Sequence, residues 1–180
     1  FGPKGEDPYA YFDRQMDPNN PSKILLSPYF LGSGTPDMDS SAQGAMYGLN
    51  ISTEPKDIYQ ACLEGVAYEL RRNIDILKSM GMDPQKIVAT GGGSQNKKWL
   101  QIKANILGLP VTAMKNKDAG TIGTAIVVGT SMGLFSSLEE GMERLVQRGE
   151  IYVPHLEAKK QYDALYRNYL KMIQGQKELK

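Results

Sequence analysis

The sequence predicts an α/β fold, in which short strands alternate with helices and form a small, mostly parallel sheet. Three observations support this prediction. Short apolar runs bounded by glycine and proline alternate along the chain with longer segments of helical periodicity, a pattern typical of α/β layers. The helical segments outnumber the strands, which indicates a small sheet. The length of 180 residues corresponds to about one domain and suffices to bury a core.

The N-terminal third is predicted to begin irregularly and then to form two strands. Residues 1–23 are rich in proline, glycine, aspartate and asparagine, so we expect an irregular arm with one helical turn at Tyr9–Arg14. Residues 24–30 form a predicted strand, and Pro28 places it at a sheet edge or at its own end. A loop and a second short strand, residues 44–50, follow.

A long helix is predicted next. Thr53 is the expected N-cap, and Pro55 lies in the first turn, where a missing N–H is tolerated. The helix runs to about Met80, and Gly81 suits the position after its end. Its first half is apolar nearly all round, so we expect it to be buried on several sides.

Acidic residues at two places in this region are candidates for a special role. Glu64 lies in the buried half of the long helix, and a buried acid must be paired. Arg71 or Arg72, about two turns further on, is the expected partner. Asp37 and Asp39 form an Asp-x-Asp pair in a predicted loop; the pattern can contact Mg²⁺ but is more common as solvated turn residues.

The middle of the chain contains the clearest alternation of strand and helix. A strand at residues 86–90 is followed by a helix at residues 95–107, which Gly108 ends. Another short strand covers residues 110–114. Residues 119–133 are predicted to form a helix of small residues with poor intrinsic propensity, which indicates close approach of another backbone or of a ligand.

The C-terminal part is predicted to be helical. Ser137 and Glu140 form a capping box that opens a helix to about Arg148. The last helix, residues 156–174, carries apolar and tyrosine side chains on one stripe, as expected for ordinary packing. Residues 176–180 are expected to form a solvated tail.

Composition excludes several classes of function. The net charge of +1, with acids and bases mixed, gives no electrostatic footprint for nucleic acid or an anionic membrane. The sequence has neither an apolar run long enough to span a bilayer nor a signal peptide. One cysteine excludes an internal disulfide and fits a cytoplasmic protein. Because the chain begins with Phe1, we expect it to be a piece of a longer protein.

The most informative segment is the glycine turn between the middle strand and its helix. Gly91, Gly92 and Gly93 are followed by Ser94 and Asn96. Glycines let a ligand approach the backbone, and a helix start offers unpaired N–H groups. The spacing matches neither the dinucleotide fingerprint nor the phosphate loop. Two interpretations remain open: the segment is a ligand-binding turn, or it is a tight connection between strand and helix without a ligand.

Three ordered blocks of sequence resemble the C-terminal domain of the FGGY carbohydrate kinases, the family of xylulokinase, gluconokinase and glycerol kinase. The blocks are Pro28 to Pro36 with Ala42 to Leu49 and Asp57 to Gly65; Thr90 to Ile102 with Ile106 to Val111; and Ala119 to Ala125. The resemblance assigns residues 24–175 to that nucleotide-binding domain. The chain departs from many members at Gly32–Gly34, where they carry Gly-Glu-Arg, and at Gln43, where they carry Arg.

The resemblance implies a fold, a site and cofactors. The fold is that of an actin-like ATPase (ribonuclease H-like) C-terminal domain, incomplete at its N-terminal edge. The turn would hold the adenosine of ATP, with Gly92 as a backbone platform, Asn96 as a polar contact, and Gly91, Gly93 and Ser94 beside them. The helix at residues 119–133 would pack behind the turn. ATP and Mg²⁺ are the implied cofactors. We assign no metal ligand to this chain.

The resemblance also implies what the chain lacks. The catalytic aspartate and most sugar contacts lie upstream in the family, so we expect no catalytic residue here and no activity of the isolated chain. The implied substrate is a sugar or polyol, with a pentulose such as xylulose favoured, bound with a missing N-terminal domain. Exposed sheet edges should lead to self-association. The alternatives are a non-catalytic actin-like nucleotide- or partner-binding module and, disfavoured by the glycine spacing, a dinucleotide-dependent oxidoreductase.

Overall fold

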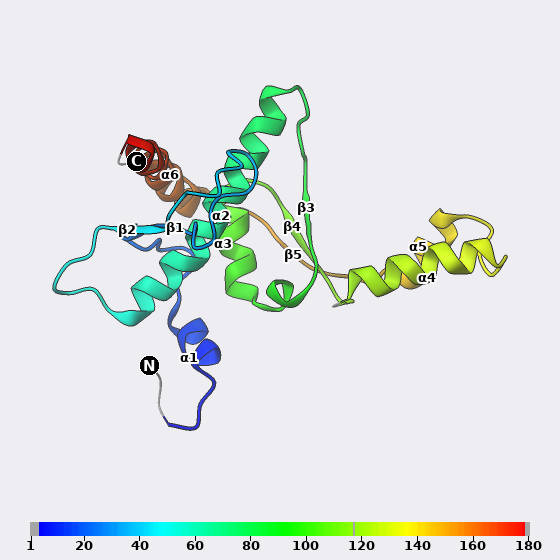
Figure 1. Cartoon of the computed structure of the whole chain (residues 1–180). Coiled ribbons are helices and arrows are strands. Elements are labelled where there is room, and N and C mark those ends of the chain that lie inside the picture. Colours follow the sequence, from blue (N-terminus) through cyan, green and yellow to red (C-terminus); the bar gives the residue numbers. More distant parts are fainter. Residues whose placement is uncertain (1–3, 117, 179–180) are drawn as a thin grey trace.

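The computed structural model describes residues 4–116 and 118–178 (Figure 1). The α-helices are α1 (Pro8–Gln15), α2 (Pro55–Ser79), α3 (Lys97–Leu107), α4 (Ala119–Ser131), α5 (Leu138–Leu145) and α6 (Leu156–Glu178), and η1 (Gly92–Gln95) is a short 3-10 helix. The strands are β1 (Leu25–Ser27), β2 (Ala45–Tyr47), β3 (Ile87–Ala89), β4 (Val111–Met114) and β5 (Arg148–Tyr152). Short strands among longer helices confirm the predicted α/β class.

The strands form two small sheets, so the expectation of one mostly parallel sheet is wrong for the described residues. β1 pairs with β2 in antiparallel register, and the second sheet has the order β3-β4-β5. β3 and β4 are parallel, with α3 between them in the chain, whereas β5 runs antiparallel to β4. Sequence analysis misses β5 because it extends the preceding helix to about Arg148 and assigns no strand after it. Pairing with β4 makes this weakly apolar segment a strand.

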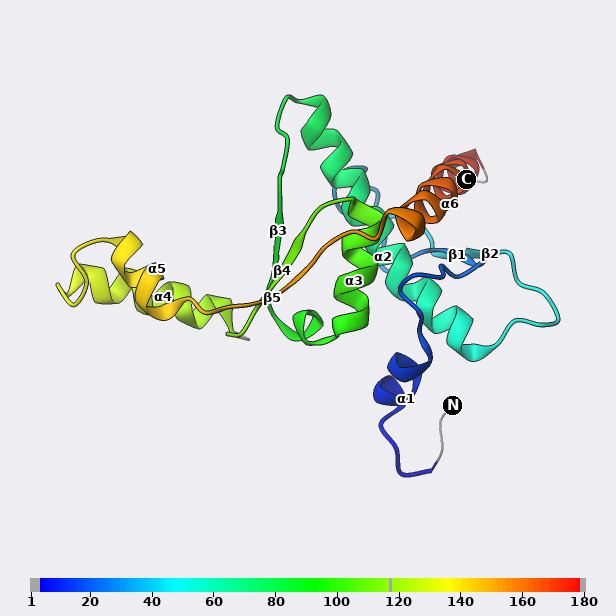
Figure 2. The ribbon, with the colours of Figure 1, turned by 180° about the vertical axis from the view of Figure 1, so that it is seen from behind.

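The core lies where α2, α3 and α6 meet (Figure 1). Its largest cluster of buried side chains includes Tyr68 on α2, Ile102 on α3, and Tyr162 and Tyr169 on α6. A second cluster joins α3 to the β3-β4-β5 sheet. The tyrosine stripe of the last helix therefore packs inside the protein, as predicted. The hairpin of α4 and α5 projects away from this core in both views (Figures 1 and 2).

A glycine inside α2 lets the helix lie directly on β1. A Cβ atom at Gly65 would stand 2.3 Å from the carbonyl oxygen of Leu26. Every other residue type would force the strand and the helix apart, which accounts for a glycine in the middle of a long helix despite its poor helix propensity.

The start of α2 differs from the prediction by one residue. Glu54 is the N-cap, and its backbone N–H donates to the carboxylate of Asp57 at 2.9 Å. The expected cap, Thr53, instead accepts a hydrogen bond from the backbone N–H of Asn50 at 3.0 Å. The threonine hydroxyl thus closes the turn before the helix and is not used as the helix cap. α5 also ends at Leu145 rather than near residue 148.

The predicted irregular arm is more ordered than expected over its described part, residues 4–23. It contains the two-turn helix α1, and Met16 at the end of α1 is only 3% exposed. The side-chain amide of Gln60 donates to the backbone oxygens of Asp17 and Asn20 at 3.2 and 2.9 Å. These contacts hold the arm against α2. Residues 1–3 lie outside the described residues.

Residues 176–178 were expected to be part of a solvated tail, but they belong to α6, which continues to Glu178. Lys177 pairs with Asp37 at 2.9 Å, and the side chain of Gln176 donates to the backbone oxygen of Gln43 at 3.0 Å. Asp37 also pairs with Arg72 at 2.8 Å. Asp37 is therefore a partner in an ion-pair network rather than a solvated turn residue. Residues 179–180 lie outside the described residues.

Glu64 is 1% exposed, and the expectation that an arginine pairs with it is wrong. Arg71 pairs with Asp163 at 2.7 Å. Arg72 pairs with Asp37 and with Glu69, at 2.8 and 2.9 Å. Both arginines therefore point toward carboxylates nearer the surface, where keeping a charge costs less than inside the core.

The Glu64 carboxyl is instead held by neutral donors. Its Oε1 atom accepts hydrogen bonds from the backbone N–H of Ser22, the side-chain amide of Gln60 and the hydroxyl of Tyr162, at 3.1, 2.7 and 3.1 Å. Its Oε2 atom is buried without a hydrogen-bond partner among the described residues. Burial raises the pKa of this carboxyl from 4.5 to about 8, against the opposing effect of the three donors. The group is consequently a neutral acid at pH 7.

One face of the β3-β4-β5 sheet is open. Val88, Thr112 and Ile151 lie in one row across the sheet, and Val88 and Ile151 are 53% and 60% exposed. Apolar side chains on the α4–α5 hairpin are also exposed, among them Val127 at 56% and Met132 at 72%. Exposed apolar patches of this kind mark surfaces that contact another segment or chain. No helix in the described part of the chain is long and apolar enough to cross a membrane.

Candidate functional site

The glycine turn connects β3 to α3, as predicted, and its backbone requires glycine at the first position. Gly91 has φ +79° and ψ −171°, a region essentially restricted to glycine. Its carbonyl oxygen accepts two hydrogen bonds from Ser94, one from the backbone N–H at 3.1 Å and one from the hydroxyl at 2.7 Å. Ser94 is 5% exposed, so its side chain supports the turn from inside.

The other two glycines serve different needs. A Cβ atom at Gly93 would stand 2.6 Å from Cζ3 of Trp99, so that glycine lets the indole ring pack under the turn. At Gly91 and Gly92 a Cβ atom would meet no heavy atom within 4 Å. Gly92 is exposed, and its φ is not in the left-handed region. Neither packing nor backbone strain requires glycine at this position, and the bare backbone leaves an open platform.

Asn96 caps the helix that follows. Its Oδ1 atom accepts a hydrogen bond from the backbone N–H of Trp99 at 2.9 Å, and its Nδ2 atom donates to Oδ1 of Asp13 at 2.7 Å. A side-chain amide has two N–H donors and two acceptor lone pairs. These contacts use one of each, which leaves one donor and one acceptor for another partner.

The structure thus brings the five predicted residues into one short turn, but they do not all face outward. A Cβ atom at Gly91 or Gly92 would meet open space and Asn96 is half-buried, whereas Ser94 and the indole beneath Gly93 fill the inner side. Asp13 is a contact that sequence analysis missed. It lies 83 residues before Asn96, within the predicted helical turn Tyr9–Arg14, and no local pattern indicates such a pairing.

An apolar hollow of about 260 Å³ lies next to the turn. Val88 and Thr90, just before the glycines, form one wall, and Ala119, Ile122 and Gly123 of α4 form another. α4 packs on α5 and faces the residues just before the turn across this hollow; its packing behind the turn stays a prediction. Ala119 and Gly123, two of its small residues, line the hollow.

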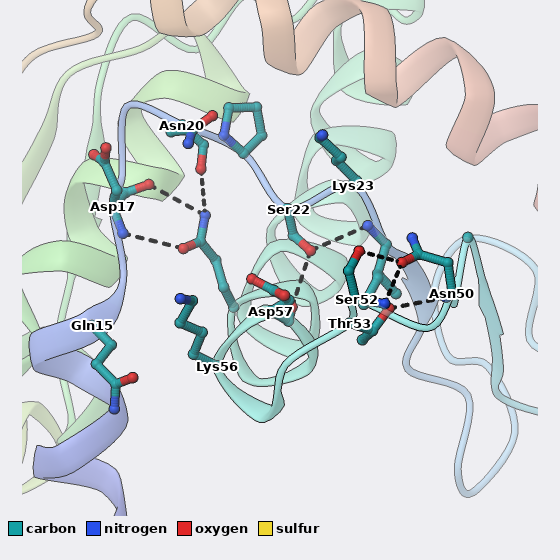
Figure 3. Close-up of a pocket in the computed structure, with 14 residues that line it drawn as sticks. Gln15, Asp17, Asn20, Ser22, Lys23, Asn50, Ser52, Thr53, Lys56 and Asp57 are labelled. Atoms are coloured by element: carbon teal, nitrogen blue, oxygen red, sulfur yellow. Dashed lines mark hydrogen bonds between the residues drawn. The ribbon is translucent and has the colours of Figure 1, made fainter.

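A second, polar pocket of about 290 Å³ lies elsewhere, between the arm, the loop after β2 and the start of α2 (Figure 3). Lysines and carboxylates line it together: Lys23, Lys56, Asp17 and Asp57. Their charges balance, and many of the polar groups bond to one another, as the dashed lines in Figure 3 show. It contains none of the predicted site residues. Among the described residues no group of three or more His, Cys, Asp or Glu side chains could hold a metal ion.

Comparison with known proteins agrees with the blocks found in the sequence. The profile of the FGGY family of carbohydrate kinases, C-terminal domain, matches residues 4–132. The chain is 29% identical over 156 residues to a xylulose kinase of Bacillus subtilis, covering 87% of this chain and 31% of that protein. It is 30% identical over 163 residues to a glycerol kinase of Streptococcus pneumoniae, covering 88% and 32%.

A solved structure shows the same arrangement. The crystal structure of xylulose kinase from Rhodospirillum rubrum superposes with a TM-score of 0.83 at 27% identity, over 98% of this chain and 36% of that chain. The present chain therefore spans about a third of the length of these relatives. Since the family profile covers most of the sequence, including the glycine turn and α2, the chain belongs to the FGGY family of carbohydrate kinases and corresponds to their C-terminal domain, with an actin-like fold.

Proposed function

We propose that this chain is the ATP-binding part of a sugar kinase, which transfers the γ-phosphate of ATP to a hydroxyl of a sugar or polyol. The observation that supports it is the open platform at Gly92 beside the half-buried amide of Asn96. A backbone without Cβ atoms lets a planar base lie close. An amide that offers one donor and one acceptor complements the edge of adenine.

The rest of the machinery belongs to the same proposal. In this proposal the catalytic aspartate and the sugar site lie outside this chain, which spans about a third of the length of its relatives. ATP brings Mg²⁺, for which we assign no ligand here. A pentulose such as xylulose is the favoured substrate, because xylulose kinases are among the relatives. Glycerol kinases of similar identity are also among them, so polyols are tested as substrates too. We also propose a cytoplasmic location, because the single cysteine, Cys62, is free and a free thiol fits a reducing compartment.

The experiment that tests this function has two stages. Isothermal titration of the chain with ADP should give saturable binding, and NADH should give none. A coupled ADP assay of the chain with xylulose, gluconate or glycerol should show no sugar-dependent ATP hydrolysis, whereas the full-length protein should turn over one of them. A full-length protein that binds ADP but phosphorylates nothing would favour the non-catalytic actin-like module. Binding of NADH without ADP would revive the oxidoreductase alternative.

Self-association of this chain is a further expected result, because the open sheet face carries Val88 and Ile151. Two copies should bury these exposed side chains together. Light scattering at increasing concentration should give a mass above that of the monomer. Replacing both side chains by lysine should reduce association, whereas lysine at Leu170, a half-exposed position on α6, should not. A monomer at all concentrations contradicts this expectation.

A further inference from the structure

We propose that Asp13 is a positioning residue for the nucleotide-binding turn and that it acts through the side chain of Asn96. The inference rests on the proposed function, since it concerns the same turn. Asp13 belongs to α1, which includes the predicted helical turn Tyr9–Arg14. It would contact no nucleotide itself; its carboxylate would hold the amide that does.

One carboxylate oxygen of Asp13 accepts hydrogen bonds from two parts of the fold, the glycine turn and α2. Oδ1 of Asp13 accepts a hydrogen bond from Nδ2 of Asn96 at 2.7 Å and another from the hydroxyl of Tyr59 at 2.8 Å. Tyr59 lies on α2, so Asp13 stands between the long helix and the glycine turn. All three side chains are partly buried, and hydrogen bonds to an ionised group are the stronger ones.

The consequence is a fixed orientation of the Asn96 amide. The terminal torsion of an asparagine is broad and roughly two-fold, so the amide can otherwise exchange its oxygen and nitrogen. A carboxylate only accepts hydrogen bonds, so Asp13 requires the nitrogen on its side. The backbone N–H of Trp99 requires the oxygen on the other side. Asp13 and the helix cap together determine which donor and which acceptor remain for a base.

If Asp13 served only to dock α1 against the protein, different results would be expected. α1 has other attachments: the ring of Phe12 stacks on Tyr59 with centroids 5.3 Å apart. In addition, Lys98 donates to the backbone oxygens of Arg14 and Met16, at 2.7 Å each. Loss of the Asp13 carboxylate should therefore leave α1 in place. If Asp13 only docked the helix, removing the Tyr59 hydroxyl from the same oxygen would have the same effect on ligand binding.

The test is titration of the full chain with ADP, using Asp13→Ala and the matched control Tyr59→Phe. We expect Asp13→Ala to weaken ADP binding about tenfold and Tyr59→Phe to change it less than about twofold. In an Asn96→Ala background, Asp13→Ala should change binding less than about twofold, because the residue it positions is gone. Thermal unfolding establishes that each variant is folded. If Asp13→Ala fails to fold, Asp13→Asn keeps a neutral acceptor and should weaken binding about threefold.

The outcomes separate this inference from the function on which it rests. If the unaltered chain does not bind ADP, the proposed function fails. If it binds ADP and folded Asp13→Ala binds as tightly, only the positioning role is overturned. Equal losses for Asp13→Ala and Tyr59→Phe, or a loss that persists undiminished in the Asn96→Ala background, also overturn it.

Discussion

We expect the unaltered chain to lose stability as the pH rises from about 4.5 to about 8, and we expect the replacement of Glu64 by glutamine to abolish this loss. The carboxyl is fully buried and, among the described residues, has no cation beside it and accepts hydrogen bonds only from neutral groups of the arm, α2 and α6. Ionisation would place an uncompensated charge inside the core. Glutamine keeps the accepting oxygen and carries no charge at any pH.

The direction follows from the two pKa values of the Glu64 carboxyl. It is about 8 in the folded chain and near the ordinary 4.5 in the unfolded chain. Between these values the folded chain binds one proton more than the unfolded chain. The free energy of unfolding therefore falls with rising pH, by about 1.4 kcal/mol per pH unit, and several kcal/mol are lost over the interval. Below pH 4.5 and above pH 8 this group contributes no slope.

Denaturant unfolding at pH 5, 6, 7 and 8 measures this dependence. The stability of Glu64→Gln relative to the unaltered chain should be lowest at pH 5 and should rise steadily toward pH 8. Glu143→Gln, at an exposed glutamate of α5, is the matched control and should leave the dependence unchanged. A Glu64→Gln variant that loses stability with pH as steeply as the unaltered chain would show that the carboxyl is already ionised at neutral pH.

Replacing Gly92 by tryptophan is expected to abolish ADP binding and to leave the fold intact. The reason lies in the geometry: a Cβ atom at this position meets no heavy atom within 4 Å, so the new side chain extends into the space over the platform. Because a planar base needs that space, affinity should fall by more than about a hundredfold, which corresponds to more than about 2.7 kcal/mol.

Two controls make the result specific to the platform. Gly92→Ala adds a single methyl group and should weaken binding only modestly. Gly34→Trp places the same bulk at another glycine whose Cβ atom would meet nothing, in the loop after β1, and should leave binding unchanged. Undiminished ADP affinity of a folded Gly92→Trp variant would contradict the assignment of this turn.

Local sequence signals predicted the turn well. Gly108 ends α3 in the left-handed conformation, with φ +65°, as its place after the periodic residues indicates. Ser137 caps α5, as its capping box with Glu140 predicts, whereas Asn96, expected inside a helix from residue 95, is the N-cap of α3, which begins at Lys97. Signals of this kind work because capping and turn geometry depend on residues only a few positions apart.

Contacts between distant segments could not be predicted in the same way. The partner of Glu64 was expected two turns away on its own helix, yet its donors include Ser22, 42 residues earlier, and Tyr162, 98 residues later. The Asp13–Asn96 bond has no local signature either. β5 became a strand only because β4 lies beside it. In each case tertiary packing decided among options that the local sequence left equally open.

The central claim, that the glycine turn holds the adenosine of ATP, is tested most directly by two-dimensional ¹H–¹⁵N NMR of the chain during titration with ADP. The account predicts that the largest shifts fall on the backbone amides of Gly91, Gly92 and Gly93 and on the side-chain amide of Asn96. Binding that instead shifts residues of the polar pocket around Lys23 and Lys56, or no binding at all, would contradict it.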